Sequence, residues 1–119
     1  MLSASRKVDS REEALAAAHE AVEIFRRLAR DRAEVFLPYL ATSLSVTSDV
    51  LAALERHPEA MQTAGEALGI LAPFVERFPG RHGDLARYIG ACILRHSEAA
   101  GMASDIALLE RVARALDRR

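Results

Sequence analysis

The 119-residue chain carries 16 Lys and Arg against 17 Asp and Glu, so its net charge of −1 lacks the basic excess typical of nucleic-acid-binding domains. The single Cys excludes an internal disulfide and suits a reducing compartment. Half of the residues are hydrophobic but few are aromatic, which favours packed helices over a β-sandwich. With neither a signal-peptide core nor a long uncharged apolar stretch, we expect a cytoplasmic protein without contact to nucleic acid or membrane.

Residues 1–10 are expected to form a flexible arm, and residues 11–119 a single helical domain. Ser10 and Glu13 fit a capping box, in which the serine oxygen accepts from the amide of Glu13 at the start of a first helix over about residues 11–30. Apolar residues at helical spacing then make a stripe so broad that it should be covered from more than one side. Its central members are Ala14, Ala18, Ala21, Phe25 and Leu28.

Prolines mark the next two helix boundaries. The second helix is expected to begin near Pro38, because the missing N–H of proline costs nothing in a first turn. It should end near His57, because Pro58 disfavours helical geometry in the residue before it. A third helix is then expected over about residues 58–78.

The third helix contains an unusual line of residues. Gly65, Gly69 and Pro73 follow one another at four-residue spacing, so they share one side of the helix. Pro73 removes the amide that would bond to Gly69, and a kink is expected there. We interpret the line as a bend that lets neighbouring backbones approach, and its functional alternative is a hinge or the floor of a groove.

The segment 78–83 is expected to be a turn rather than a phosphate-binding loop, because it lacks a Lys and a preceding strand. A fourth helix should span about residues 83–100 and stop at Gly101, since glycine readily ends a helix in the left-handed conformation. A fifth helix should follow, capped by the side-chain oxygen of Ser104 or Asp105.

Residues 12–28 and 58–74 are two copies of one helix. Glu13-Ala14-Leu15 recurs as Glu59-Ala60-Met61, at a spacing of about 46 residues, and a degenerate third copy covers the fifth helix. A fixed period of this kind indicates a repeat architecture, in which each unit covers the apolar face of its neighbour.

The helical unit resembles the tetratricopeptide repeat (TPR). Ala14-x3-Ala18-x2-Ala21 and Ala60-x3-Ala64-x2-Ala67 match the A-x3-F-x2-A pattern of the second TPR helix. Residues 36–44 look like the F-L-P-D-L-A-x-S-L segment of long-period bacterial TPR proteins, and residues 12–29 are similar to the segment that follows it. The resemblance implies an all-α, right-handed TPR-like α-solenoid of antiparallel helices in the order B-A-B-A-B.

The resemblance also implies a non-catalytic role, as a protein–protein interaction or scaffold module rather than an enzyme. In TPR arrays the A helices line a concave surface that binds a protein or peptide. The residues that would line it are Thr42, Ser45, Asp49, Arg87, Gly90 and Leu94. The alternative is a regulatory domain that holds a small apolar ligand near the Pro73 kink, in a dry pocket lined by Leu71, Phe74 and Ile89.

The order B-A-B-A-B lacks a first A helix. The first helix should therefore expose part of its broad stripe, including Ala17, Val22 and Ile24, where that partner would have packed. We infer a homodimer in which this face meets a symmetry mate, or equally a piece of a longer repeat array.

Four histidines and one cysteine are the candidates for metal or covalent chemistry. Cys92 and His96 lie one helical turn apart and could form a cluster with His82, but a zinc site needs three or four ligands within reach. We therefore expect no metal and no cofactor, with Cys92 acting as a small apolar residue. No catalytic residue is expected, since nothing orients the His of a Cys–His pair. His19 and His57 should be exposed.

Overall fold

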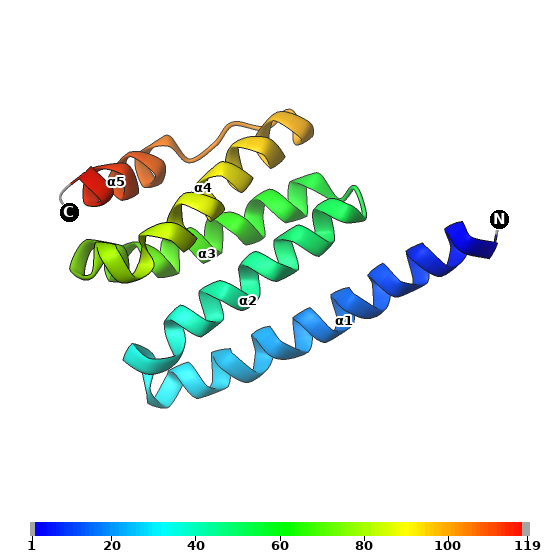
Figure 1. The fold of residues 1–119 in the computed structure, drawn as a ribbon, viewed down its shortest axis with the longest axis horizontal. Coiled ribbons are helices and arrows are strands. Elements are labelled where there is room, and N and C mark those ends of the chain that lie inside the picture. The colour runs from blue at the N-terminus through cyan, green and yellow to red at the C-terminus, as the bar shows by residue number, and fades with distance from the viewer. Residues whose placement is uncertain (1, 118–119) are drawn as a thin grey trace.

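The structure, a computed structural model, describes residues 2–117, and the side chains of residues 10–117. The described part is built from five helices and contains no strand, which confirms the all-α prediction (Figure 1). The helices are α1 (Leu2–Asp31), α2 (Ala33–Ala53), α3 (His57–Arg77), α4 (Pro79–Ala100) and α5 (Ile106–Asp117).

Short connections place consecutive helices side by side and antiparallel. Figure 1 shows α1, α2 and α3 laid in a row, with α4 following and α5 at the far edge. α1 packs on α2, α2 on α3 and α3 on α4, while α5 packs on both α3 and α4. The result is a flat body with principal extents of 51 × 34 × 19 Å. The right-handed TPR-like solenoid stays a prediction.

The hydrophobic core is centred on α3, because this helix is covered on several sides. Leu68, Leu71 and Val75 of α3 are fully buried and pack with Ile89 of α4. The alanines of the repeated pattern in α3 are buried as well, and their small side chains let neighbouring helices pack closely. These alanines are Ala60, Ala64 and Ala67, and Ala72 of the same helix is buried too.

Ion pairs also connect α3 with other helices. Arg26 of α1 lies 2.8 Å from Glu66 of α3, and Arg77 of α3 lies 3.1 Å from Glu34 of α2. Arg111 of α5 donates two hydrogen bonds to the carboxylate of Glu76, at 2.9 and 2.6 Å. Since these pairs are largely exposed, each contributes little to stability.

The start of the first helix differs from the prediction. α1 begins at Leu2, because no Pro or Gly interrupts residues 2–10. Ser10 therefore lies inside the helix, and the capping box predicted with Glu13 is wrong. Residues 2–10, which were expected to form a flexible arm, have a helical backbone, and Met1 lies outside the described residues. The flexibility of this segment stays a prediction.

Two other helix starts also lie earlier than predicted. α2 begins at Ala33, so that Pro38 lies inside the helix rather than in its first turn. α4 begins at Pro79, so the turn expected over residues 78–83 is wrong. The fixed φ angle of proline suits the first helical position, and the helix starts there directly after Phe78.

The predicted end of α4 and start of α5 are confirmed. Gly101 has a φ of 66°, and the amide of Met102 donates to the carbonyl of Ser97 across 3.0 Å, as in a Schellman motif. Of the two proposed caps for α5, Asp105 takes the role: its Oδ1 accepts from the amide of Leu108 at 3.0 Å.

The structure revises the interpretation of the Gly65, Gly69 and Pro73 line. α3 continues through Pro73 to Arg77, and a Cβ placed on Gly65 or Gly69 would meet nothing within 4 Å. Close approach of a neighbouring backbone is therefore wrong as an explanation of the two glycines. Gly65 lines a small pocket of about 210 Å³ beside the α4–α5 connection, which agrees with the groove-floor alternative. The kink stays a prediction.

α2 is long and apolar enough, by length and composition, to cross a membrane. The helix contains Glu34 and Asp49, so it is not the long uncharged apolar stretch that was expected to be absent. The finding is weak support for a membrane span, since core helices of soluble proteins have the same length and composition, and α2 packs between α1 and α3. Location in the cytoplasm stays a prediction.

Candidate functional site

An open groove of about 600 Å³, which we call the aromatic groove, lies beside the start of α2 and the junction between α3 and α4. Aromatic side chains from three parts of the chain line it: Tyr39 of α2, Phe74 of α3, and Phe78 between α3 and α4. Tyr39 is 55% exposed. Its ring stacks on Phe25 of α1 with centroids 5.7 Å apart, so it is held in place while one face stays open.

Two arginines give the groove its charge. Arg77 and Arg81 both lie over the ring of Phe78, with their guanidinium carbons 5.4 and 5.5 Å from its centroid. Arg77 is also paired with Glu34 of α2, at 3.1 Å. Among the described residues Arg81 has no carboxylate within ion-pair distance, so its charge is available to an acidic partner.

The six residues predicted to line one concave surface do not lie together in the structure. Thr42 is exposed and lines the aromatic groove. Arg87, Gly90 and Leu94 line a different pocket, of about 270 Å³, between α4 and α5. Ser45 is buried, so the expectation that it faces a partner is wrong.

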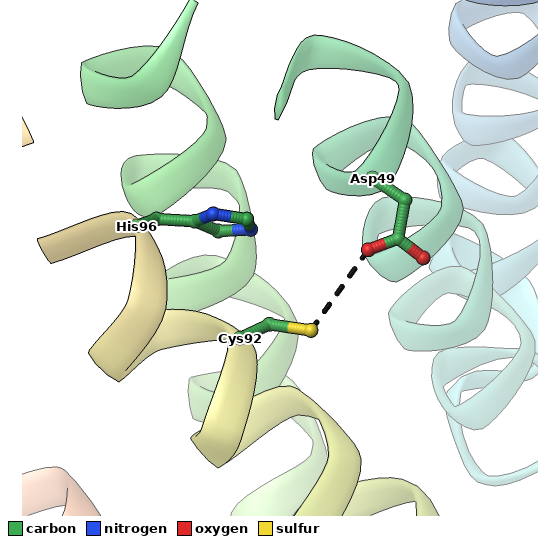
Figure 2. Close-up of side chains that lie close together, drawn as sticks. All are labelled: Asp49, Cys92 and His96. Atoms are coloured by element: carbon green, nitrogen blue, oxygen red, sulfur yellow. Dashed lines mark hydrogen bonds between the residues drawn. The ribbon is translucent and has the colours of Figure 1, made fainter. Parts of the chain in front are cut away.

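Asp49, the sixth of those residues, instead meets Cys92 and His96. One possible ligand atom from each of the three lies within 4.8 Å of the others, as Figure 2 shows. Cys92 and His96 come from successive turns of α4, and Asp49 reaches them from α2. His82, the third ligand considered from the sequence, lies elsewhere: its ring packs edge-on against Phe74, with centroids 5.7 Å apart.

Hydrogen bonds from two α4 side chains orient this cluster. The hydroxyl of Tyr88 donates to Oδ2 of Asp49 at 2.7 Å, while Oδ1 lies 3.9 Å from the sulfur of Cys92. The hydrogen bond to the carboxylate raises the pKa of Tyr88 to about 12, so the phenol stays protonated and keeps donating. Arg95 donates through Nη2 to the same sulfur at 3.0 Å. Cys92 is thus buried in polar rather than apolar surroundings.

His96 is 6% exposed, and its Nε2 has no hydrogen-bond partner among the described residues. Burial, followed by the positive charge of Arg95, lowers the pKa of His96, which keeps the imidazole neutral. His57 also lies near enough for its charge to lower this pKa, and its Nδ1 is likewise buried without a partner among the described residues. The expectation of an exposed His57 is therefore wrong, whereas His19 is exposed as predicted.

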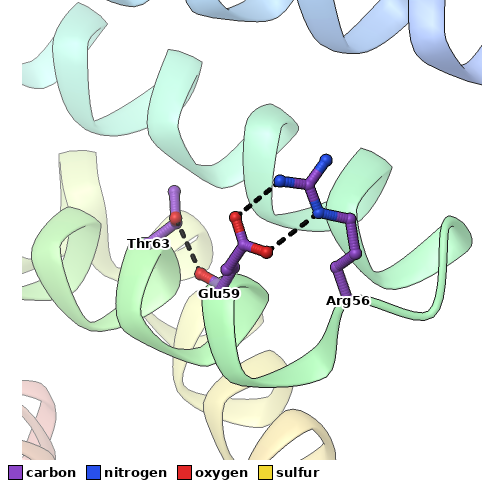
Figure 3. A network of polar contacts seen from close by, with 3 residues as sticks. All are labelled: Arg56, Glu59 and Thr63. Atoms are coloured by element: carbon purple, nitrogen blue, oxygen red, sulfur yellow. Dashed lines mark hydrogen bonds and ion pairs between the residues drawn. The ribbon is translucent and has the colours of Figure 1, made fainter.

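The first turn of α3, which carries His57, is held by the contacts in Figure 3. Arg56 donates from Nε and Nη2 to the two carboxylate oxygens of Glu59, at 2.9 and 2.7 Å. Thr63 donates its hydroxyl to the carbonyl of Glu59 at 2.8 Å. Because both side chains of this fork are largely exposed, it contributes little to stability.

The arrangement limits what the cluster can do chemically. A thiol, a carboxylate and a neutral imidazole are all ligands of transition metals. The three groups also resemble a nucleophile with a base, but Cys92 is only 2% exposed, which keeps substrates from its sulfur. The geometry is compatible with metal ligation.

The predicted dimer face is exposed only in part. Ala17 and Ile24 are exposed on α1, whereas Val22 is buried in the core, so the expectation that Val22 is available to a partner is wrong. Val22 belongs to the side of α1 that packs on α2. Leu28, one turn beyond Ile24, adds a further exposed apolar side chain to the outer face.

The pocket suggested for a small apolar ligand has a different lining. Leu71 and Ile89 are fully buried among core side chains, and Phe74 is the member of the trio that lines the aromatic groove. That groove is open and carries arginines, so it differs from the dry pocket expected there. No observation on the described residues favours the ligand-binding alternative.

Comparison with known proteins adds no relative. No family model matches the chain, and neither a curated protein nor a solved structure shows significant similarity to it. Membership of the TPR family therefore stays a prediction.

Proposed function

We propose that the protein is a non-catalytic interaction module that binds an acidic, extended peptide segment of a partner protein in the aromatic groove. The observation that carries this proposal is the coincidence, in one open groove, of exposed aromatic rings with an arginine that has no acidic partner within the described part of the chain. The repeat of residues 12–28 in 58–74, together with the buried alanines of α3, supports a TPR-like scaffold for it.

The chemistry of the groove defines the peptide. Arg81 is held over the ring of Phe78, so it loses little conformational freedom when it forms a forked pair with an Asp or Glu of the partner. Tyr39 and Phe78, whose rings are exposed, offer apolar surface to a large aliphatic or aromatic side chain of the same segment. Affinity should come from the apolar contacts, and the acidic preference from the arginines.

Selection from a displayed library of random linear peptides tests the proposal. We expect enrichment of sequences that combine Asp or Glu with a large apolar residue. Arg81→Glu should weaken the best peptide about tenfold, since replacing attraction with repulsion costs about 1.4 kcal/mol or more. Fluorescence anisotropy with the labelled peptide measures this.

Arg11→Glu is the matched control. It changes the net charge equally, but Arg11 lies beside Ala53, at the opposite end of α2 from the groove, and the affinity should stay within about twofold. Equal weakening by both variants would show binding to overall charge alone. That result, or the absence of any enriched peptide, contradicts the proposal.

We also propose that the exposed outer face of α1, with Ala17 and Ile24, joins two copies of the chain. Light scattering at micromolar concentration should give the mass of two chains. Ile24→Glu should reduce it to one chain, because a carboxylate would be buried without a partner in the contact. Ile106→Glu, at an exposed site on α5, should leave the dimer intact. A single-chain mass for the unmodified protein rejects the dimer.

A further inference from the structure

We propose that Asp49, Cys92 and His96 form a site for a divalent transition-metal ion of the Zn²⁺ type. The three side chains come from two helices and bring a carboxylate oxygen, a sulfur and an imidazole nitrogen within 4.8 Å of one another. Ligands this close can contact one ion after small side-chain adjustments, because metal–ligand bonds are about 2.0–2.3 Å long.

The unsatisfied nitrogen of His96 is an independent observation that points to a ligand. Its Nε2 is buried and has no hydrogen-bond partner among the described residues. Buried polar atoms in native proteins nearly always have a partner, so an exception calls for an unseen group. Figure 2 shows the His96 ring extending into the space that Cys92 and Asp49 also face, which is where an ion would lie.

Charge balance favours a divalent ion. Binding would release the thiol proton of Cys92 to solvent, and the resulting thiolate and the carboxylate of Asp49 would together cancel the two positive charges. With the neutral imidazole of His96, the buried group of ion and ligands then carries no net charge, which minimises its cost in a low-dielectric interior. A mixed sulfur, nitrogen and oxygen set suits zinc better than magnesium or calcium, which prefer oxygen alone.

Neighbouring side chains donate hydrogen bonds to two of the three ligands, as commonly occurs around metal sites. Tyr88 donates to Oδ2 of Asp49 and leaves Oδ1 on the side of Cys92. Arg95 donates to the sulfur of Cys92, which would stabilise a thiolate. Such outer contacts orient the ligands and strengthen binding. A water molecule or His57, whose Nδ1 is buried and unpartnered among the described residues, would complete a tetrahedral set.

Titration with Co²⁺ as a spectroscopic substitute for Zn²⁺ tests the site, using untagged, reduced protein freed of metal by a chelator. We expect one ion per chain, with a thiolate-to-cobalt charge-transfer band in the near ultraviolet, and displacement of the cobalt by Zn²⁺.

The ligand variants Asp49→Asn and Cys92→Ser preserve side-chain size, and each should lower the affinity for Co²⁺ at least about a hundredfold while the helical circular-dichroism signal stays unchanged. Tyr88→Phe should lower it about tenfold, because only the orienting hydrogen bond is lost. His19→Gln, at an exposed histidine, is the control and should bind as the unmodified protein does.

Three results would overturn the proposal. They are the absence of stoichiometric binding by the unmodified protein, full binding by Cys92→Ser, and a stoichiometry of one ion for two chains. The last would place the ion between molecules instead of among three side chains of one chain. The titration of the unmodified protein decides the matter even where a variant fails to fold.

Discussion

Replacing Leu68 with Ala should lower the free energy of unfolding by about 3–5 kcal/mol. Leu68 lies in the middle of α3 and is fully buried among side chains of the central core. The substitution removes three buried carbon atoms and leaves a cavity that the surrounding helices can fill only in part. Urea unfolding followed by far-ultraviolet circular dichroism measures the change.

Leu94→Ala is the matched control for this experiment. It removes the same atoms from a side chain on α4 that is 55% exposed, and the loss should be below about 1 kcal/mol. Equal losses in the two variants would mean that α3 is not the centre of the core. The described packing of α2, α4 and α5 around α3 would then be wrong.

Replacing Pro73 with Ala should have the opposite effect and stabilise the protein by about 1–3 kcal/mol. Pro73 is exposed, lies inside α3, and deprives the carbonyl of Gly69 of its helical hydrogen bond. Alanine restores the missing amide and has the highest helix propensity. The midpoint of thermal unfolding should rise accordingly, and calorimetry measures it.

Pro58→Ala separates this effect from a general benefit of removing proline. Pro58 lies in the first turn of α3, where no helical hydrogen bond is missing, so the change should stay within about 0.5 kcal/mol. A destabilised Pro73→Ala variant would show that the core needs a bend at this position. In that case the expected kink would be part of how α3 fits its neighbours.

Two helix boundaries were predictable because a single residue decides each of them. Gly101 ends α4 and Asp105 caps α5, as their chemistry predicts. The end of α2 was predicted near His57 from the position of Pro58, but α2 ends earlier, at Ala53. Glu55 has a φ of 61° there, and the amides of Glu55 and Arg56 donate to Ala52 and Leu51 in a Schellman arrangement without glycine. The tertiary packing of α2 on α3 overrides the roughly 1–2 kcal/mol preference against this conformation.

The candidate metal site was only half predictable. Cys92 and His96 lie one turn apart, and helical spacing alone brings them to the same face. Asp49 precedes Cys92 by 43 residues, and it reaches the sulfur only because α2 and α4 approach each other across α3. The sequence therefore showed too few ligands, and His82, which is nearer in the chain, was considered in place of Asp49.

Local sequence patterns were enough to predict that the chain is helical, roughly where its helices lie, and that α3 repeats the pattern of α1. These features depend on spacing and on residues close in the chain, whose conformational preferences act locally. The packed fold was needed to show that Ser45 and Val22 are buried, that Arg81 lies over Phe78, and that Asp49 faces Cys92. Which faces of helices meet depends on side-chain packing between distant segments, and local preferences do not specify it.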